Sequence, residues 1–298
     1  MISICIGIYN YDVTELVNDL VKQANEEKIA YEIILLDDAS ERYFQLINAK
    51  LDFFPNVTYL QNFINVGRAV IRNTLASKAK YPYLLFLDCD AQISHPDYLK
   101  KYFAEIPTTI VSGGTEYSSE KPAKNCRLRW TYGIKREQKS AKLRMINPNF
   151  SFTPFNFMIR ADIFNETAFD ESVKGYGHED TLFGIELLRK GITVRHIDNP
   201  LIHLGLNTTD QYLLQIENAI QNLIIIQQKI ADSQQFIDSV ALLKTYHKLR
   251  KIGLVSLYKK FYKIFKSLII KNLKSSHPSI LFFDLYKLGY LCQLNPKL

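Results

Sequence analysis

The sequence predicts an α/β fold in which a mixed, mainly parallel sheet is flanked by helices and followed by a helical C-terminal extension. Three observations lead to this prediction. Apolar runs that end in polar residues alternate with stretches of helical periodicity in the first part of the chain. After Asn207 the periodicity is helical. A chain of 298 residues, 47% of them hydrophobic, is long enough for one large α/β domain and an appendage.

The first elements of the predicted sheet follow one another in a regular order. Ile2–Ile8 is a β-rich apolar run. Leu16, Leu20 and Ala24 have the spacing of one helix face, which predicts a helix over 14–24. The alternation continues with strands over 33–36, 57–60 and 84–87 and with a helix over 68–79. Strands joined through helices in this way pair in parallel with right-handed crossovers.

The following part of the chain is less regular. Residues 150–160 read as an aromatic-rich strand, a helix begins near Asp162, and a helix over 179–190 ends at Gly191. Short strands are expected over 194–197 and 201–204. The segment 113–148 has no clear periodicity and is rich in Lys, Arg and Ser, so it is either a solvated surface or a mobile loop over a diphosphate.

Two carboxylates, Asp88 and Asp90, stand at the end of the buried run 84–87. Carboxylates at such a place are costly unless they are exposed in a crevice, paired, or neutralised by a cation. Open α/β sheets bind ligands in the crevice at the carboxyl ends of their strands, and diphosphate oxygens with one or two carboxylates suit a hard divalent ion. Two polar residues at an ordinary strand exit are the alternative.

Four segments, in order and at suitable spacing over roughly residues 1 to 205, resemble the motifs of family 2 glycosyltransferases. Ile2–Asn10 is similar to their opening strand, and Leu35–Ser40 to their Asp-Asp-Gly-Ser turn. Asn65–Asn73 resembles their Asn-x-Gly…Arg-Asn segment, and Leu87–Asp90 their Asp-x-Asp motif. The chain departs from the family at Ala39, where Gly is usual, and at Gly7, where Pro or Thr is frequent, and both changes concern turn geometry rather than chemistry.

A pair of acids at a predicted helix start forms a further motif. Gly175 and Gly177 precede Glu179 and Asp180. Glycines let the backbone approach a ligand closely, although acids at a helix start also suit the helix dipole. The stretch resembles the Gly-Gly-Glu-Asp segment of chondroitin-polymerase-like and β-1,4-galactosyltransferase-like enzymes, with His178 in place of the second Gly. In those families the second acid is the base toward the acceptor hydroxyl.

The resemblance implies a GT-A-like, Rossmann-related fold and a metal-dependent inverting transfer from a nucleotide-diphosphate sugar, UDP-linked, with Mn²⁺ or Mg²⁺ as cofactor. The implied catalytic residues are Asp180 and Glu179, and the implied metal ligands are Asp90, His203 and Asp88. His203 fits the family position better than His196, and a core histidine is the alternative. The implied nucleotide-sugar contacts are Ile8, Tyr9, Asn10, Asp38, Asn65, Gly67, Arg68, Arg72 and Asp88. On the acceptor side we expect Trp130, as a stacking platform or a packing residue, with Asn156, Gly177 and His178.

Charge is unevenly distributed in the sequence. The chain has 37 Lys and Arg against 30 Asp and Glu, a net charge of +7. Residues 239–283 contain ten of the basic residues and no acid, which leaves −3 for the rest. A helix over 253–274 has an apolar arc of Leu, Ile, Tyr and Phe with lysines facing away, so it either packs on the core or attaches to an anionic membrane surface.

Compartment and domains complete the expectations. The four cysteines lie far apart, there is no basic leader ahead of the first apolar run, and no segment has about 18 uncharged apolar residues. We expect a cytoplasmic protein, with peripheral attachment to the inner face of the membrane as the alternative. The expected domains are 1–208, with a nucleotide-binding half 1–110 and an acceptor half 111–208, and a helical extension 209–298.

The expected partners are a nucleotide-sugar donor and a glycan or lipid-linked acceptor in cell-surface polysaccharide assembly, and no nucleic acid. Two other functions stay open at this point. A sugar nucleotidyltransferase also uses paired acids and a metal, but it should have a basic Gly-rich loop near its first strand, and Ile6–Asn10 contains no Lys or Arg. A non-catalytic sugar-binding protein on the same fold would not need Asp90 and Asp180 to converge.

Overall fold

The computed structural model describes residues 1–173, 175, 177–229 and 233–294. These residues form two compact units. The sheet unit consists of residues 1–118, 137–174 and 179–205, and the helical unit of residues 119–136, 175–178 and 206–298. The boundary near residue 205 is close to the predicted one at 208. Residues 119–136 and 175–178, which we expected in the acceptor half, belong instead to the helical unit.

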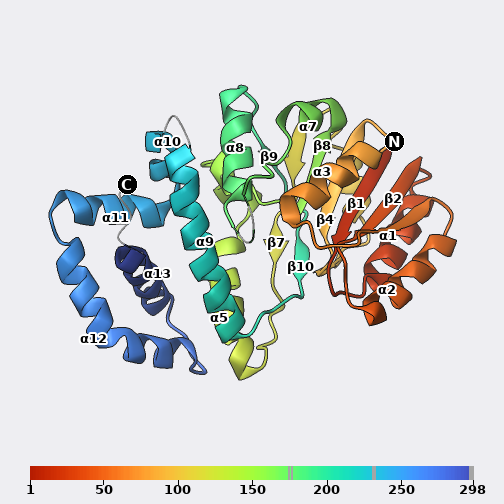
Figure 1. Ribbon diagram of the computed structural model, residues 1–298. Helices are drawn as coiled ribbons and strands as arrows, with labels where there is room; N and C mark the ends of the chain where they lie inside the picture. Colours follow the sequence, from red (N-terminus) through yellow and green to blue (C-terminus); the bar gives the residue numbers. More distant parts are fainter. Residues whose placement is uncertain (174, 176, 230–232, 295–298) are drawn as a thin grey trace. The chain divides into compact units, whose positions relative to one another are not determined.

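A seven-stranded sheet is the centre of the sheet unit (Figure 1). Its strands, in spatial order, are β3 (Val57–Gln61), β2 (Tyr31–Asp37), β1 (Ile2–Ile8), β4 (Tyr83–Asp88), β8 (Asn156–Arg160), β6 (Ile110–Ser112) and β9 (Arg195–His196). The first four are parallel, and β8 runs antiparallel to β4 and β6. The predicted mixed, mainly parallel sheet is therefore confirmed.

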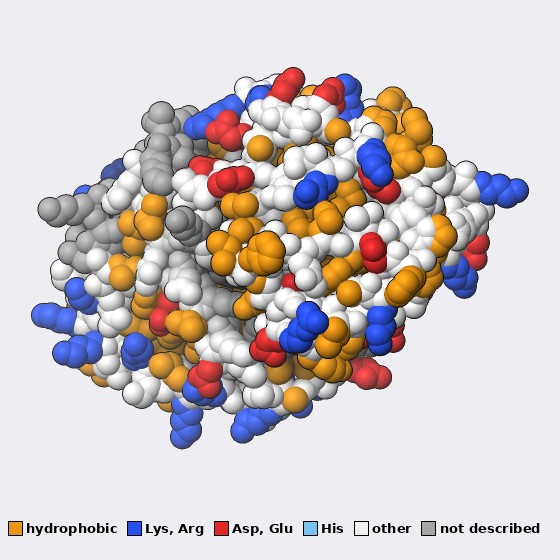
Figure 2. Space-filling model, turned by 45° about the vertical axis from the view of Figure 1, so that its right-hand side comes forward, with side chains coloured by type: hydrophobic (Ala, Val, Ile, Leu, Met, Phe, Trp, Pro, Cys, Tyr) orange, Lys and Arg blue, Asp and Glu red, His pale blue; other side chains and the backbone are white. Residues whose placement is uncertain are grey.

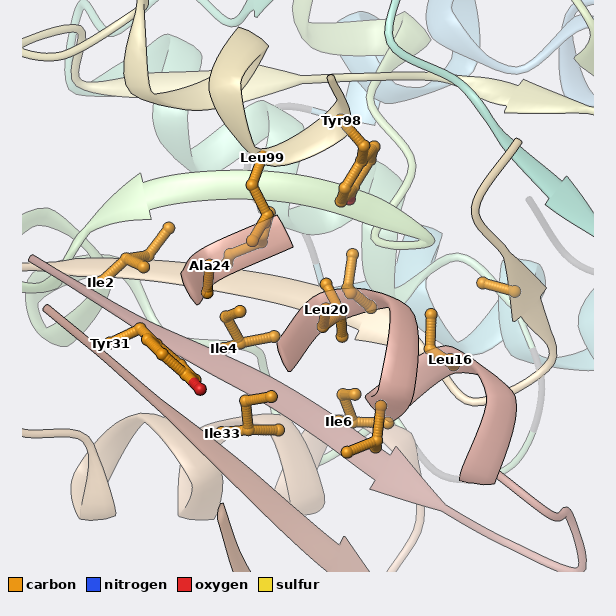
Figure 3. Close-up of a cluster of buried hydrophobic side chains, with 14 of the residues drawn as sticks. Ile2, Ile4, Ile6, Leu16, Leu20, Ala24, Tyr31, Ile33, Tyr98 and Leu99 are labelled. Carbon is orange, nitrogen blue, oxygen red and sulfur yellow. The ribbon is translucent and has the colours of Figure 1, made fainter. Parts of the chain in front are cut away.

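Helices cover both faces of this sheet because successive strand residues point to opposite sides. Their bounds are α1 (Thr14–Glu26), α2 (Arg42–Asn48), α3 (Arg68–Lys78), α4 (Tyr98–Phe103), α6 (Ala141–Arg144), α7 (Ala161–Thr167) and α8 (Glu179–Arg189). Ile4 and Ile6 of β1 pack with Leu20 of α1 in one core (Figure 3). Cys5 and Phe86 belong to the other core, which includes residues of α3, α7 and α8.

A small second sheet brings distant parts of the chain together. It consists of β5 (Ala91–Gln92), β10 (Leu201–His203) and β7 (Thr115–Glu116), with β10 in the middle. β10 is antiparallel to β5, and the register places His203 opposite Ala91. The residue after Asp90 is thereby fixed beside the predicted histidine ligand.

Two expectations about the middle of the chain are corrected. The aromatic-rich strand is shorter than 150–160, because Asn149–Ser151 forms a 3₁₀ turn and Pro154 cannot donate to a ladder. The segment 113–148 is not simply a solvated surface, since Arg129 and Arg144 are buried. Arg144 donates to the carbonyl oxygens of Ser112, Gly113 and Ile197, which organises this segment around its guanidinium.

The helical unit is built from α5 (Arg127–Tyr132), α9 (Thr209–Lys229), α10 (Ser233–Ser239), α11 (Ala241–Lys251), α12 (Val255–Leu273) and α13 (Ile280–Leu294). Leu128, Tyr212, Tyr262 and Phe283 form its core. The predicted helices over 211–230 and 253–274 correspond to α9 and α12, and residue 230 lies outside the described residues. Among the helices described, none has the length and apolar character needed to cross a bilayer.

Charged side chains of both signs and exposed hydrophobic side chains are interspersed over the face that Figure 2 shows. Single exposed hydrophobic residues of this kind are ordinary in folded proteins, because polar surface alone cannot cover a globule. A contiguous exposed apolar face, in contrast, can mark a surface that binds a protein or a membrane.

Candidate active site

The end of β4 presents the two aspartates of the strand-end motif. Asp88 is the last residue of β4, lies opposite Gly7 of β1, and its N–H donates to the carbonyl of Phe155 at 3.1 Å. A side chain at position 7 would touch Ile71 of α3, so strand and helix approach closely there. Asp88 and Asp90 are both partly exposed. The strand therefore delivers two carboxylates to its carboxyl end without burying them completely.

Arg72 joins this strand end to the acidic motif of α8. Its Nη2 lies 2.8 Å from Asp88 Oδ1, and its Nη1 lies 3.6 Å from Glu179 Oε1. The guanidinium is buried and packs over the ring of Phe169. Burial raises the pKa of the Asp88 carboxyl, but the positive charges of Arg72 and Arg68 outweigh it and hold that pKa below its ordinary value. Asp88 is thus kept ionised as one member of a charge network.

Glu179 and Asp180 form the first turn of α8. Asp180 Oδ1 accepts a hydrogen bond from the Thr181 N–H at 2.7 Å. Burial, and then the neighbouring charge of Glu179, raise the pKa of Asp180 from 3.8 to about 6. Burial therefore opposes the helix start, which favours the ionised carboxylate. Asp180 is still mostly ionised at neutral pH, but it binds a proton far more readily than an exposed aspartate.

Asp90 faces His203 across the small second sheet. The distance from Asp90 Oδ2 to His203 Nε2 is 3.6 Å. The imidazole is stacked between the rings of Tyr117 and Phe155, with centroid distances of 5.5 and 5.2 Å. A Cβ at Gly205 would stand 1.9 Å from Asp90 Oδ2, so this position must be a glycine for the carboxylate to keep its place. The two stacked rings hold the His203 imidazole, and the glycine at position 205 leaves room for the Asp90 carboxylate.

These two side chains fit a divalent ion that is also held by a diphosphate. Adjacent ligand atoms around an octahedral ion with bonds of about 2.1 Å are about 3.0 Å apart, so Asp90 Oδ2 and His203 Nε2, now 3.6 Å apart, would approach each other slightly to share one ion. Within the described ranges, no group of three or more His, Cys, Asp or Glu side chains is arranged to hold a metal. A Mg²⁺ or Mn²⁺ ion held by one or two protein side chains takes the rest of its ligands from substrate phosphates and water.

His196, the other histidine of the predicted short strands, has a structural role in the core. It is buried, its Nδ1 lies 2.7 Å from Arg144 Nη1, and its Nε2 lies 2.9 Å from the Pro148 carbonyl. Burial lowers its pKa to about 4. His196 is therefore a neutral core histidine.

Asp38 organises the loop that carries the Asn-x-Gly segment. Its carboxylate accepts hydrogen bonds from the N–H groups of Val66 and Gly67 at 2.9 and 3.0 Å, and its carbonyl accepts one from the Asn65 side chain at 3.2 Å. Ala39 follows with a φ of +61°, the left-handed conformation for which glycine is usual. Ala39 therefore adopts, at a cost in strain, a conformation that glycine would adopt more easily.

Two predicted site residues have structural roles instead. Ile8 is completely buried in the core, and its carbonyl accepts the Asp38 N–H, so the expected nucleotide contact is corrected. The Asn156 amide is also buried. It accepts from the hydroxyls of Tyr98 and Tyr102 and donates to the carbonyls of Gly114 and Asn199. With its hydrogen-bonding capacity used inside the core, Asn156 has no group left for an acceptor sugar.

The remaining predicted residues lie at different places. Tyr9 and Asn10 follow β1, where the Tyr9 side chain is exposed and Asn10 accepts from the Glu41 N–H. Arg68 is exposed at the start of α3. Trp130, Gly177 and His178 belong to the helical unit, and their acceptor role stays a prediction. His178 has a φ of +73°, a conformation that glycine adopts readily.

Sequence reasoning missed several residues that shape this site. Tyr117 and Phe155 stack on His203, and Gly205 makes room for Asp90. Tyr11 lies near Asp90, and burial, followed by the charge of Asp90, raises the pKa of the Tyr11 phenol to about 12. None of the four carries a local signal, since their importance comes from the pairing of β10 with β5 and β7. Only the pattern of short strands around residue 200 pointed to that region.

Solved structures with a similar fold are glycosyltransferases. TarS residues 1–349 from S. aureus superposes with a TM-score of 0.56, covering 98% of this chain and 88% of that one at 17% identity. The mannosyltransferase PcManGT from Pyrobaculum calidifontis, solved with GDP-Man and Mn²⁺, has a TM-score of 0.58, covering 99% and 88% at 12% identity. The fold is that of the GT-A glycosyltransferases.

The family model described as "Glycosyl transferase family 2" matches residues 3–167, more than half of the sequence. The chain belongs to glycosyltransferase family 2 and is a glycosyltransferase. It is also similar to the chondroitin synthase of Escherichia coli, at 24% identity over 215 residues. That match covers 58% of this chain but only 30% of the relative, so the chain corresponds to less than a third of that protein.

Proposed function

We propose that the enzyme transfers a sugar from a UDP-linked donor to a hydroxyl of a glycan or lipid-linked acceptor, with inversion at the anomeric carbon and with Mn²⁺ or Mg²⁺. One observation carries the proposal. Arg72 connects Asp88 at the strand end with Glu179, next to Asp180, in the same unit that pairs Asp90 with His203. A non-catalytic protein would not need these acids to converge.

The donor side of the site is formed by strand ends and the loop after β3. Asp38 would accept from the base, with Tyr9, Asn10 and Asn65 near the nucleotide. Asp90 and His203 would hold the metal ion, and Asp88 would contact the ribose or the metal. When bound, the ion neutralises charge that develops on the leaving diphosphate. Asp88 in turn is oriented by its hydrogen bond from Arg72.

The acceptor side centres on Asp180. This carboxylate would remove the proton from the acceptor hydroxyl while that oxygen attacks the anomeric carbon from the face opposite the diphosphate. A base with a pKa of about 6 is largely ionised at neutral pH and still accepts a proton readily. Glu179 supports it by holding Arg72 and by adding negative charge beside it.

Proteins similar to this chain bear on the choice of donor and product. TarS has been solved with UDP and with UDP-GlcNAc, which favours UDP, while the mannosyltransferase was solved with GDP-Man, so guanosine donors belong in the test. A relative named chondroitin synthase favours a polysaccharide as the product. The four cysteines are free, which suits a reducing compartment, and we propose cytoplasmic action. Family membership and the lack of a basic loop after β1 argue against a nucleotidyltransferase.

The decisive experiment measures slow donor hydrolysis with a panel of UDP- and GDP-sugars, with Mn²⁺, with Mg²⁺ and with a chelator. We expect metal-dependent hydrolysis of one or a few UDP-sugars. An accepting glycan then allows the anomeric configuration of the product to be read by NMR. Hydrolysis that is unaffected by the chelator would contradict metal dependence, a preference for GDP-sugars would contradict the donor, and a retained configuration would contradict the role of Asp180.

A further inference from the structure

Helix α12 has two apolar faces, and only one of them is used inside the helical unit. Tyr262, Ile269 and Leu273 are buried in the core with residues of α13. The contact is close, since a Cβ at Gly289 of α13 would stand 2.1 Å from the Tyr262 ring. The Tyr258 hydroxyl donates to the Leu285 carbonyl at 3.1 Å. α12 is therefore fixed to its unit through this face.

The second apolar face of α12 is exposed. Leu257, Ile264 and Leu268 are 63%, 74% and 55% exposed, and Phe261 and Phe265 are exposed beside them with ring centroids 4.7 Å apart. These residues recur at intervals of three and four, so they form one continuous stripe. Most of the apolar arc that the sequence predicted is therefore exposed, while Tyr258 of that arc packs against the core of the helical unit. We call this stripe the α12 arc.

Lysines border the α12 arc. Lys260 is three residues from Leu257 and four from Ile264, and Lys271 is three from Leu268, so both stand next to the arc on the helix surface. Lys263 lies farther round, and all three are exposed. Within the described part of the chain, none of the three has an ion-pair partner. The last turn of α11 adds Lys248, Arg250 and Lys251 close in sequence to the start of α12.

This chemistry discriminates between possible occupants. A second copy of the chain packed arc to arc would bring lysine borders together, and residues 239–283 contain no acid to compensate. A bilayer crossing does not fit, because no described helix is long and apolar enough. An interface of anionic lipid accepts an apolar stripe among its acyl chains and lysines among its head groups.

We infer that the α12 arc attaches this enzyme peripherally to an anionic membrane surface, with its apolar side chains in the head-group boundary and Lys260, Lys263 and Lys271 at the phosphates. The inference depends on the helical unit alone, so it is independent of the donor, the metal and the base. Attachment of this kind is reversible, because it combines modest apolar burial with electrostatic attraction that salt screens.

The test is co-sedimentation of the full chain with vesicles of phosphatidylcholine containing phosphatidylglycerol, compared with phosphatidylcholine alone, without any donor. We expect binding to the anionic vesicles at low salt and its loss at high salt. The charge variant Lys260→Gln/Lys263→Gln/Lys271→Gln should bind about a hundredfold more weakly, since each Lys near such a surface contributes about fivefold. The arc variant Leu257→Ser/Ile264→Ser should lose at least about tenfold, because each buried CH₂ contributes about fourfold.

A matched control comes from the sheet unit. Leu46 and Phe53 are also exposed hydrophobic residues, and the variant Leu46→Ser/Phe53→Ser should bind vesicles like the parent. Since all substituted side chains are exposed, circular dichroism should show the same helix content in every variant. The inference is overturned if the full chain does not bind at low salt, or if the arc variant binds normally. It is also overturned if an α12-dependent dimer forms in solution and no vesicles are bound, since a second copy would then cover the arc.

Discussion

Replacing Asp180 with Asn should make the enzyme slower and the fold more stable at the same time. The pKa of Asp180 is raised from 3.8 to about 6, first by burial and then by Glu179. A difference of about two pKa units corresponds to about 3 kcal/mol between the charged and the neutral carboxyl. The folded chain therefore carries a cost of up to about that size when Asp180 is ionised, and the neutral amide of Asn does not carry it.

The sign of the pH dependence follows from the direction of the pKa change. The folded chain binds the Asp180 proton more tightly than the unfolded chain, so protonated Asp180 contributes its full stability below about pH 4, and this contribution is lost as the pH rises through 6. The Asp180→Asn variant should therefore exceed the parent in free energy of unfolding by up to about 3 kcal/mol above pH 7 and by almost nothing at pH 4. Turnover should fall by roughly 10²- to 10⁴-fold with donor affinity nearly unchanged.

Urea unfolding at pH 4 and 7.5 measures the first effect, and donor calorimetry with product assays measures the second. Glu186→Gln is the matched control, because Glu186 is an exposed acid of the same helix that pairs with Arg189, and its loss should change stability by less than about 1 kcal/mol. An Asp180→Asn variant no more stable than this control at pH 7.5 would refute the burial argument. A turnover within tenfold of the parent would move the role of base to Glu179.

Three further outcomes are expected. Asp90→Asn should abolish Mn²⁺-dependent UDP binding in calorimetry, because an amide offers no charge to a hard cation. The control Asp97→Asn, at an exposed acid paired with Lys101, should bind normally, and unchanged affinity in Asp90→Asn would remove Asp90 from the metal site. Glu179→Gln should move the acid limb of the kcat/KM profile from about pH 6 to lower pH, since a like charge beside Asp180 is removed. An acid limb that stays at the same pH or moves to higher pH would show that another group titrates there. Ala39→Gly should raise the free energy of unfolding by roughly 0.5 to 1 kcal/mol in urea unfolding, because relief of the left-handed strain at φ +61° exceeds the extra backbone entropy that glycine loses on folding. A destabilised variant would contradict this balance.

The parts of the fold that could be predicted are those whose signal is local. The strands β1 to β4 and the helices α1 and α3 were expected at nearly their observed bounds, because apolar runs and 3.6-residue periodicity reflect burial on a sheet or a helix face. The segment 113–148 could not be predicted in this way. Its organisation depends on Arg144, a cation buried among carbonyl groups that are far apart in sequence, and arginine normally indicates surface.

The same distinction applies to the site. The positions of Asp88, Asp90 and Asp180 at a strand end and a helix start could be predicted, because an apolar run and a helical period show where such elements end and begin. Contacts between residues far apart in the sequence could not be predicted, since no local pattern shows that Arg72 reaches Glu179 or that Tyr117 stacks on His203. Asn156 and Ile8 were wrongly assigned for the opposite reason. Ile8 stands beside Tyr9 and Asn10 of the first motif, and the side chains of both Ile8 and Asn156 are buried in the core.

The single arginine shared by Asp88 and Glu179 makes the two ends of the site thermodynamically interdependent. Its charge lowers the pKa of Asp88 and also, more weakly, that of Asp180. Any ligand that draws Arg72 toward the strand end thus makes proton binding at Asp180 more favourable, and by reciprocity a proton on Asp180 strengthens the binding of that ligand by the same factor. Binding of such a ligand and protonation of Asp180 are therefore coupled, but Arg72 is a minor influence on the pKa of Asp180, so the affinity should change only slightly with pH.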